Sequence, residues 1–456
     1  MPHAVTEPVA LDKLPSAPPK ARQPDAVEFY DGARVFCLHT DSTSYAFRVT
    51  PHGDLEQLYY GDRLAADESL PSSLAALALQ GLNVLNILDA TEYFHCKSNT
   101  FPRDPEFIQI KGRNSLMLEV SCADDDFKPH TLAVRPHNAG LLQYASHKIQ
   151  KGKVWIEPRD SYAQARAEAG DGSSTLTVTM RAGEDLEVNV VYTVCPAEDI
   201  IVRRTEIRNL SATETKSVHR IMSSTLDLES SPQWTLTHLA GAWGREGQRT
   251  SVVMQPGRHG FGSKRGLVGH MHQPFAILSE GEQGYSESSG SHYGAMLIYG
   301  GNFEVECEMA ESGRVRLNLG MSTKEGVAFP LQPGAKLTSP ECALAFSSSG
   351  VNALSHHFHD FMRNRILPPE FAKSKPPVLI NTWESMYFNM TLPKIRALAR
   401  DSYSVGVELF VLDDGCAPDP PPCCPQPHHG PLTSLPQPPQ QTRHDGMRRQ
   451  SVRALR

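Results

Sequence analysis

The stretch TLTVTMRAGEDLEVNV at residues 175–190 determines the fold class of this chain. Apolar residues occupy every second position at 176–180, where they alternate with threonines, and again at 186–190, where they alternate with Glu187 and Asn189. Successive side chains of a β-strand point to opposite faces, so each half of the stretch predicts a strand with one buried and one solvated face.

The same alternation recurs from about residue 26 to residue 350. Apolar residues at 303–309 alternate with glutamates, and those at 315–319 alternate with Arg316 and Asn318. Clusters rich in Gly, Pro, Asn and Ser separate the runs, for example at 169–173 and 281–290. Many half-buried strands with few helices over such a length predict a large antiparallel β-sandwich.

The pattern changes to a helical period after residue 350. Residues 351–366 place Leu354, Phe358 and Phe361 on one helix face, and Pro368-Pro369 follows the last apolar position. Three histidines in this segment are best explained as part of its solvated face. We therefore predict a linker region at 351–376 built around one amphipathic helix.

Two short apolar runs follow the linker, at 378–380 and 407–412, with a helical segment at 394–403 between them. Unbroken apolar runs are typical of strands buried on both faces of a parallel sheet, so we predict a strand–helix–strand unit. Trp383-Glu384 and Asp413-Asp414 fall at the C-terminal ends of these strands, where such folds place ligands. We expect a substrate site to begin there; the alternative is loop residues with capping roles.

Composition excludes several classes of protein. The 456 residues carry a formal net charge of −7, without the basic stripe of a nucleic-acid binder. No apolar run approaches the 18 residues or so of a transmembrane helix. Residues 1–25 are rich in Pro and Ala, so we expect them to be disordered and not to act as a signal peptide. We therefore expect an intracellular protein, although the sequons at Asn209 and Asn389 leave secretion open.

The sequence indicates no metal site and no cofactor. Six cysteines before residue 416 are widely scattered and form no CxxC motif, which favours reduced, buried thiols. His270 and His272 would share one face of a strand, but no third metal ligand is evident.

A series of motifs gives the sequence a family resemblance. In chain order they are GDLEQLYYGDRL (53–64), DDFKP (125–129), YASHKI (144–149), HLAGAWGRE (238–246), SKRG (263–266), YGGNF (299–303), INTWES (380–385) and FVLDDG (410–415). Together they resemble glycoside hydrolase family 36, the large α-galactosidases, over nearly all of the chain to Gly415.

The resemblance implies a large antiparallel β-supersandwich at 26–350, the linker region, and the first strand–helix–strand of a (β/α)8 TIM barrel at 377–415. It implies a retaining hydrolase that needs no cofactor and releases terminal α-galactose from raffinose-type sugars through a covalent glycosyl-enzyme. Its partners would be α-galactosyl oligosaccharides, not nucleic acid or membrane. Family members are often tetramers held by the sandwich domain. The resemblance therefore also implies that this chain forms a homo-oligomer.

The resemblance also assigns substrate-binding residues. Trp383 matches a tryptophan that lines the galactose pocket, and Asp413 and Asp414 match aspartates that accept hydrogen bonds from galactose hydroxyls. Asp126 matches the aspartate of a GDFR-type motif that approaches the active site, but Lys128 stands here in place of the family's Arg. Lysine keeps the charge and loses the planar two-pronged donor, so the motif departs from the family pattern at this position.

Asp413 and Asp414 do not fit the role of a catalytic pair. Adjacent strand residues point to opposite faces, whereas retaining chemistry needs two carboxyls about 5–5.5 Å apart across one anomeric carbon. The resemblance places the nucleophile and the acid/base aspartate on later barrel strands, which this chain lacks, so we expect the chain to be truncated and inactive.

Residues 416–456 differ from the rest of the chain. They hold 10 of the 35 prolines, no aromatic residue, and five Arg against two Asp, so they cannot bury enough apolar surface to fold. We expect a disordered tail that arises from a retained intron or a shifted reading frame. Two other functions stay open: a non-catalytic sandwich for oligomerisation or carbohydrate binding, and a raffinose-synthase-like galactosyl transferase.

Overall fold

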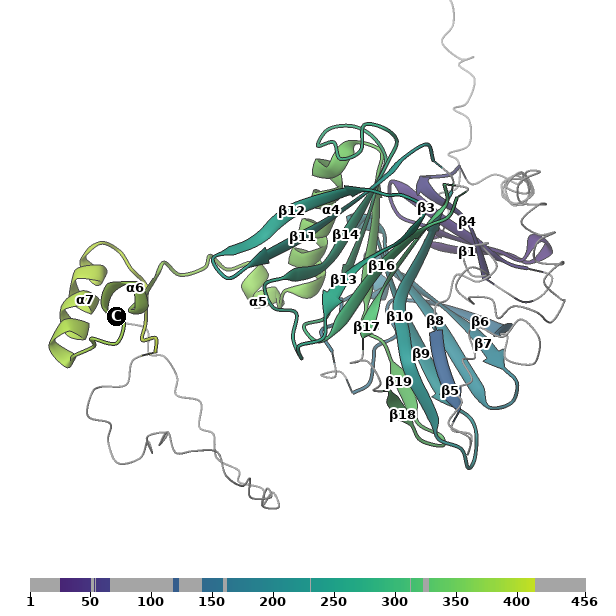
Figure 1. Ribbon diagram of the computed structural model, residues 1–456, viewed down its shortest axis with the longest axis horizontal. Helices are drawn as coiled ribbons and strands as arrows, with labels where there is room; N and C mark the ends of the chain where they lie inside the picture. The colour runs from purple at the N-terminus through teal and green to yellow at the C-terminus, as the bar shows by residue number, and fades with distance from the viewer. Residues whose placement is uncertain are drawn as a thin grey trace, which may run out of the picture. The chain divides into compact units, whose positions relative to one another are not determined.

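The computed structural model describes residues 25–50, 53, 55–65, 118–122 (backbone only), 142–158, 162–229, 231–311, 313–322 and 328–414. The chain divides after Leu367 into two compact units (Figure 1). The predicted disordered segment at 1–25 lies almost wholly outside the described residues, and so do Asp126 and the tail at 416–456.

Antiparallel sheets make up the first unit. The ten-stranded sheet has the order β12 (Arg245–Val253), β11 (Trp234–Ala242), β14 (His272–Glu280), β15 (His292–Leu297), β20 (Cys342–Ser347), β9 (Ile200–Asn209), β8 (Leu186–Cys195), β7 (Ser174–Ala182) and β6 (Gln143–Lys151), with β19 (Lys336–Thr338) also on β9. The six-stranded sheet has the order β13 (Gly257–Ser263), β16 (Phe303–Met309), β17 (Val315–Ser322), β10 (Lys216–Leu228) and β18 (Phe329–Leu331), with β5 (Leu118–Cys122) on β10. The four-stranded sheet contains β1 (Val27–Tyr30), β2 (Val35–His39), β3 (Thr43–Val49) and β4 (Leu55–Asp62).

The alternating apolar residues of the sequence form the main core. Val178 of β7 pairs with Val190 of β8, and both are fully buried. They belong to one apolar cluster with Leu317 and Leu319 of the six-stranded sheet. Because water is excluded from between the sheets, burial of this shared face holds the layers together. The predicted antiparallel sandwich is confirmed.

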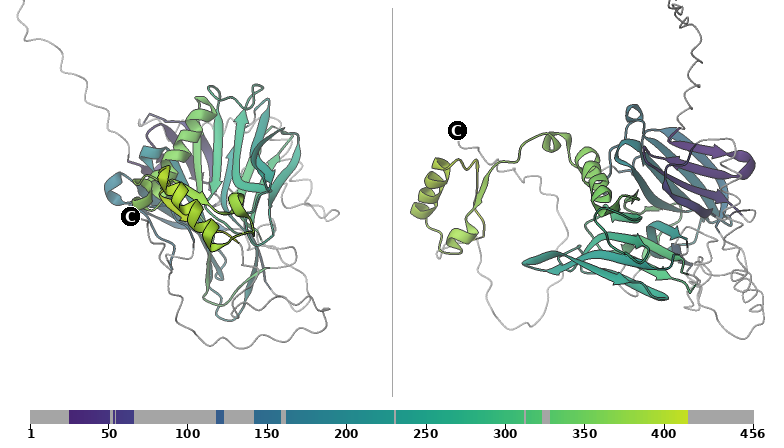
Figure 2. Two further views of the ribbon diagram at one scale, coloured as in Figure 1. Left: turned by 90° about the vertical axis from the view of Figure 1, so that its left-hand side faces the viewer. Right: turned by 90° about the horizontal axis from the view of Figure 1, so that it is seen from above.

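The four-stranded sheet, drawn in purple in Figure 2, contributes aromatic side chains to the same core. Phe47 of β3 stacks on Tyr192 of β8 with ring centroids 5.2 Å apart, and Tyr60 of β4 lies 5.8 Å from Tyr293 of β15. Such ring pairs add stabilisation beyond their buried area.

A helix covers the opposite face of the ten-stranded sheet. Along β20, Leu344 faces the main core, whereas Ala343 and Ala345 pack under α4 (Gly350–Phe361) with Leu354 and Phe358. The helix continues as one π-helical turn at Met362–Ile366, so the predicted helix is present over its expected length.

Two of the three histidines of α4 lie on its solvated face, as the sequence predicts, and the third does not. His356 and His359 are exposed. His357 is half-buried, with its Nδ1 3.6 Å from Oδ2 of Asp199.

The second unit contains the predicted strand–helix–strand. Its elements are α5 (Pro369–Ala372), β21 (Leu379–Asn381), α6 (Trp383–Met386), α7 (Leu392–Ser404) and β22 (Leu409–Val411). β21 and β22 pair in parallel, with Ile380 opposite Phe410. No helix in the described part of the chain is long and apolar enough to span a membrane.

The expectation that these two strands are buried on both faces is wrong for the described residues. Leu379 is 51% exposed, and all three residues of β22 are only half-buried. Each strand has one strand neighbour in the described chain, so an apolar run alone does not produce full burial.

Candidate functional site

The two parallel strands bring the predicted site residues to one edge of the second unit. β21 ends at Asn381 and β22 ends at Val411, and these two residues are paired in register. Trp383 and Asp413 each follow two residues later, so they leave the same edge of the sheet. Asp414 comes next on the β22 side.

Asn381 links the two strand ends through its side-chain amide. Its Nδ2 donates a hydrogen bond to Oδ2 of Asp413 at 2.7 Å, and its Oδ1 accepts one from the backbone N–H of Trp383 at 2.8 Å. One side chain therefore positions both the aromatic residue and the first aspartate.

Thr382 forms a second connection between the strands. Its backbone N–H donates to the carbonyl of Val411 at 3.0 Å, and its Oγ1 accepts from the backbone N–H of Asp413 at 3.1 Å. Thr382 is fully buried, so these bonds form away from water.

The two aspartates have different surroundings. Oδ1 of Asp413 accepts from the backbone N–H of Asp414 at 2.7 Å, and Oδ2 accepts from Asn381. These two donors hold the pKa of the Asp413 carboxyl below its ordinary value, because they stabilise the ionised form. The carboxylate of Asp414 is exposed and accepts no hydrogen bond from any described residue.

Trp383, the first residue of α6, contacts two aromatic residues that follow the helix. Its ring makes edge contacts with Tyr387 and Phe388, at centroid distances of 5.4 and 5.0 Å. Tyr387 has a left-handed backbone with φ of 47°, which is unusual for a residue other than glycine. Tyr387 and Phe388 are 52% and 60% exposed, so an apolar surface accompanies the carboxylates.

This arrangement suits the binding of a polyhydroxylated ligand. Carboxylates are strong acceptors for hydroxyl groups, and aromatic rings offer an apolar face to the C–H side of a sugar. The described residues contain no cluster of three or more potential metal ligands.

Sequence reasoning placed Trp383, Asp413 and Asp414 at this edge and missed Asn381 and Thr382. Trp383-Glu384 was expected to form the C-terminal end of the strand, whereas β21 ends at Asn381 and α6 begins at Trp383. The signal was present in INTWES, because an amide at a strand end can reach the neighbouring strand end.

Family models match most of the chain. The model of the glycosyl hydrolase family 36 N-terminal domain matches residues 53–332, and the model named Melibiase matches residues 336–418. Alpha-galactosidase 2 of Hypocrea jecorina is 33% identical over 294 residues, which are 64% of this chain and 38% of that protein. Alpha-galactosidase Mel36A of Lactobacillus acidophilus is 29% identical over 394 residues, which are 85% of this chain and 50% of that protein.

Solved structures agree with these matches. A variant of the alpha-galactosidase AgaA from Geobacillus stearothermophilus, in complex with raffinose, superposes with a TM-score of 0.68 at 25% identity over 83% of this chain and 50% of that chain. The present chain therefore spans about half the length of this neighbour, and between 38% and 50% of the two relatives above.

Proposed function

The chain belongs to glycoside hydrolase family 36, and from that premise we propose that it is part of an α-galactosidase whose sugar pocket begins at the β21–β22 edge. The observation that carries the proposal is the link from Asn381 to both Trp383 and Asp413. It sets an ionised carboxylate and an aromatic group at one edge, the combination that recognises a sugar.

The proposed substrates are α-galactosyl oligosaccharides such as raffinose. The raffinose complex of the G. stearothermophilus relative supports this choice. In the pocket, Asp414 offers an unused carboxylate to vicinal hydroxyls, Asp413 uses its remaining lone pairs, and Trp383 packs against the sugar. Asp126 stays part of the proposed pocket on the strength of its motif alone.

The 456-residue chain itself is proposed to be inactive as a hydrolase. Asp413 and Asp414 are adjacent in sequence, and retaining chemistry needs two carboxyls about 5–5.5 Å apart on opposite sides of one carbon. The expected result is no release of p-nitrophenol from p-nitrophenyl α-galactoside by the purified chain. Turnover that follows the protein through purification would contradict this.

A chimera tests the assignment of the activity. Residues 1–414 would be joined to the part of the L. acidophilus relative that follows its own matching motif, and galactose release from raffinose would be measured. Asp414→Asn should lower kcat/KM by roughly 10- to 150-fold, the equivalent of one charged hydrogen bond. Asp401→Asn on the exposed side of α7 is the matched control and should change little. A folded chimera that hydrolyses a different glycoside would refute the assignment.

Two experiments test the remaining functions, one on the same chimera and one on the 456-residue chain. Transfer of galactose to an added sugar acceptor, in preference to water, would favour the galactosyl transferase. The non-catalytic sandwich predicts sugar binding or self-association by the 456-residue chain alone. Sedimentation of that chain also tests the proposed homo-oligomer.

An intracellular location is proposed for this protein. Among the described residues, Cys37, Cys195, Cys307 and Cys342 are buried and unpaired, as in proteins of reducing compartments. The sequon asparagine at 209 is fully buried, with its Nδ2 donating to the carbonyls of Glu214 and Leu331 at 2.7 and 2.9 Å. That sequon is therefore no support for secretion.

A further inference from the structure

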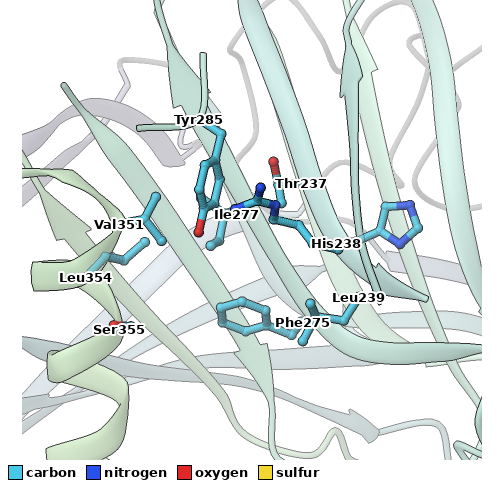
Figure 3. Close-up of a pocket in the computed structure, with 10 residues that line it drawn as sticks. Thr237, His238, Leu239, Phe275, Ile277, Tyr285, Val351, Leu354 and Ser355 are labelled. Atoms are coloured by element: carbon cyan, nitrogen blue, oxygen red, sulfur yellow. The ribbon is translucent and has the colours of Figure 1, made fainter. Parts of the chain in front are cut away.

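A cavity of about 170 Å³ opens between α4 and the outer face of β11 and β14 in the first unit (Figure 3). Its walls include Leu239 and Phe275 from the sheet and Val351 and Leu354 from the helix. For comparison, an apolar cavity of about 150 Å³ can hold a benzene molecule. The cavity therefore has room for one aromatic ring or one branched aliphatic group.

The polar side chains around the cavity leave it apolar inside. Oγ1 of Thr237 is 2.8 Å from Oγ of Ser251, and Oγ of Ser355 donates to the carbonyl of Asn352 at 2.8 Å. The ring of His238 points away from the cavity in Figure 3 and stacks on Phe261 with centroids 4.2 Å apart. The lining is mostly apolar, so the cavity favours an apolar occupant over water.

The side chain of Arg249 brings a positive charge to the wall of this cavity. The guanidinium carbon of Arg249, from β12, lies 4.2 Å from the ring centroid of Tyr285. Arg249 is exposed and forms no ion pair with any described residue. A guanidinium has five N–H donors, and a contact with a ring leaves donors available for a carboxylate.

We propose that this cavity binds a small organic carboxylate, with its ring or branched aliphatic group between α4 and the sheet and its carboxylate paired to Arg249. Charge complementarity selects this occupant, because a neutral apolar group would leave the cation at the cavity unused. The site uses residues of the first unit alone and is independent of the proposed sugar pocket.

The test uses the full 456-residue chain with phenylacetate and its neutral analogue phenylacetamide as probes. Binding would be measured by saturation-transfer NMR, with a Kd on the order of 1 mM expected for a ligand of this size. Phenylacetate should bind about 3- to 10-fold more tightly than phenylacetamide, owing to its charge-assisted hydrogen bonds.

Three variants identify the site. Arg249→Gln should bring the two probes to equal affinity, whereas Arg245→Gln, with the same charge change on the same strand, should leave the preference intact. Ser355→Trp should fill the cavity and abolish binding of both probes. Thermal unfolding of Ser355→Trp shows whether this variant is folded. Arg249→Gln changes an exposed residue, so it tests the proposal even if Ser355→Trp does not fold.

The proposal is overturned if the wild-type chain shows no saturable binding at about 10 mM phenylacetate, ten times the expected Kd. It is also overturned if Arg249→Gln keeps the preference for the anion. Sedimentation gives a third outcome: a wild-type dimer that Ser355→Trp dissociates would assign the cavity to a second copy of the chain and refute the ligand.

Discussion

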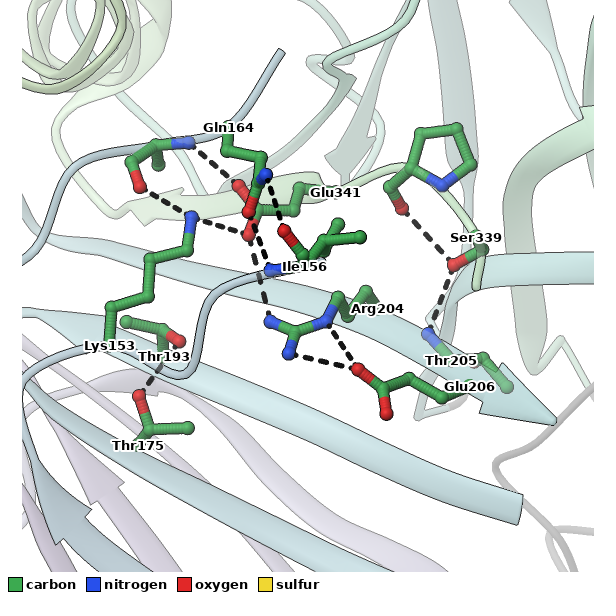
Figure 4. Close-up of polar contacts among 12 residues, drawn as sticks. Lys153, Ile156, Gln164, Thr175, Thr193, Arg204, Thr205, Glu206, Ser339 and Glu341 are labelled. Atoms are coloured by element: carbon green, nitrogen blue, oxygen red, sulfur yellow. Dashed lines mark hydrogen bonds and ion pairs between the residues drawn. The ribbon is translucent and has the colours of Figure 1, made fainter. Parts of the chain in front are cut away.

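Glu341→Gln should destabilise the first unit strongly, because it leaves a buried lysine without its carboxylate. Nζ of Lys153 lies 2.6 Å from Oε1 of Glu341, and both side chains are fully buried (Figure 4). Oε2 of Glu341 also accepts the backbone N–H of Ala165 at 2.7 Å. Among the described residues, Glu341 is the only acidic group paired with Lys153.

The magnitude follows from the burial of the pair. Breaking a fully buried ion pair by removing one partner costs about 3–5 kcal/mol. With a urea slope of about 3 kcal/mol per M, the midpoint of unfolding should fall by roughly 1 to 1.7 M. Lys153→Met should cost less, because Glu341 keeps Arg204, whose Nη1 lies 3.7 Å from Oε1.

The loss of stability caused by Glu341→Gln should become smaller at high pH. Burial lowers the pKa of Lys153 below 10.5, and Glu341 opposes that shift. Without Glu341 the pKa of Lys153 falls further, so the cost of Glu341→Gln is complete below this lowered pKa. It shrinks as the pH rises from this lowered pKa through the wild-type folded pKa of Lys153, because the buried lysine is then neutral in both folded proteins and the unfolded chains titrate alike.

Urea unfolding followed by the fluorescence of buried Trp234 measures the loss at pH 7 and again near pH 9.5. A decrease in the free energy of unfolding of less than about 1 kcal/mol at pH 7 would refute the reasoning, because removing one partner of a surface ion pair costs no more than that. A larger loss in Lys153→Met than in Glu341→Gln would also refute it.

Further predictions concern the site edge, the thiols and the sequons. Asn381→Ala should raise the pKa of Asp413 toward 3.8, as measured by carboxyl ¹³C NMR, while Asn389→Ala leaves it unchanged. The buried thiols of Cys37, Cys195, Cys307 and Cys342 should resist iodoacetamide at pH 8 until the chain unfolds, as peptide mapping can show. Burial raises the pKa of all four, to about 12 for Cys37, Cys195 and Cys342. In a secretory host only Asn389 should carry a glycan, because Asn209 is buried; a glycan on folded Asn209 would contradict its burial.

The sequence was sufficient to predict where strands occur but not which strands pair with each other. Alternation at 176–180 and 186–190 is a local signal, and it correctly assigned which residues face the core. The sheet order β15–β20–β9 depends on contacts between residues far apart in the chain, for which a single sequence carries no local signal. The same limit explains the exposure of Leu379, since burial of an apolar strand requires neighbours on both faces.

At the candidate site, the end-of-strand rule placed Trp383 and Asp413 at the strand ends and missed Asn381, which links them. Polar residues after parallel strands are visible in sequence, whereas the role of Asn381 depends on where β21 stops. Because α6 begins at Trp383, Asn381 becomes the last residue of the strand, within reach of the neighbouring strand end.

Asp413 and Asp414 therefore have different roles, although they are adjacent in sequence. Both oxygens of Asp413 accept hydrogen bonds from the chain, so its ionised form helps to hold the two strand ends together. Asp414 takes part only through its backbone N–H, and its carboxylate stays unused by the described residues. Loss of the Asp413 carboxylate should therefore disorder the edge and shift Trp383, whereas loss of the Asp414 carboxylate should weaken sugar binding with the edge intact. Comparison of Asp413→Asn with Asp414→Asn by amide chemical shifts at Trp383 distinguishes the two roles, and equal shifts would refute the division.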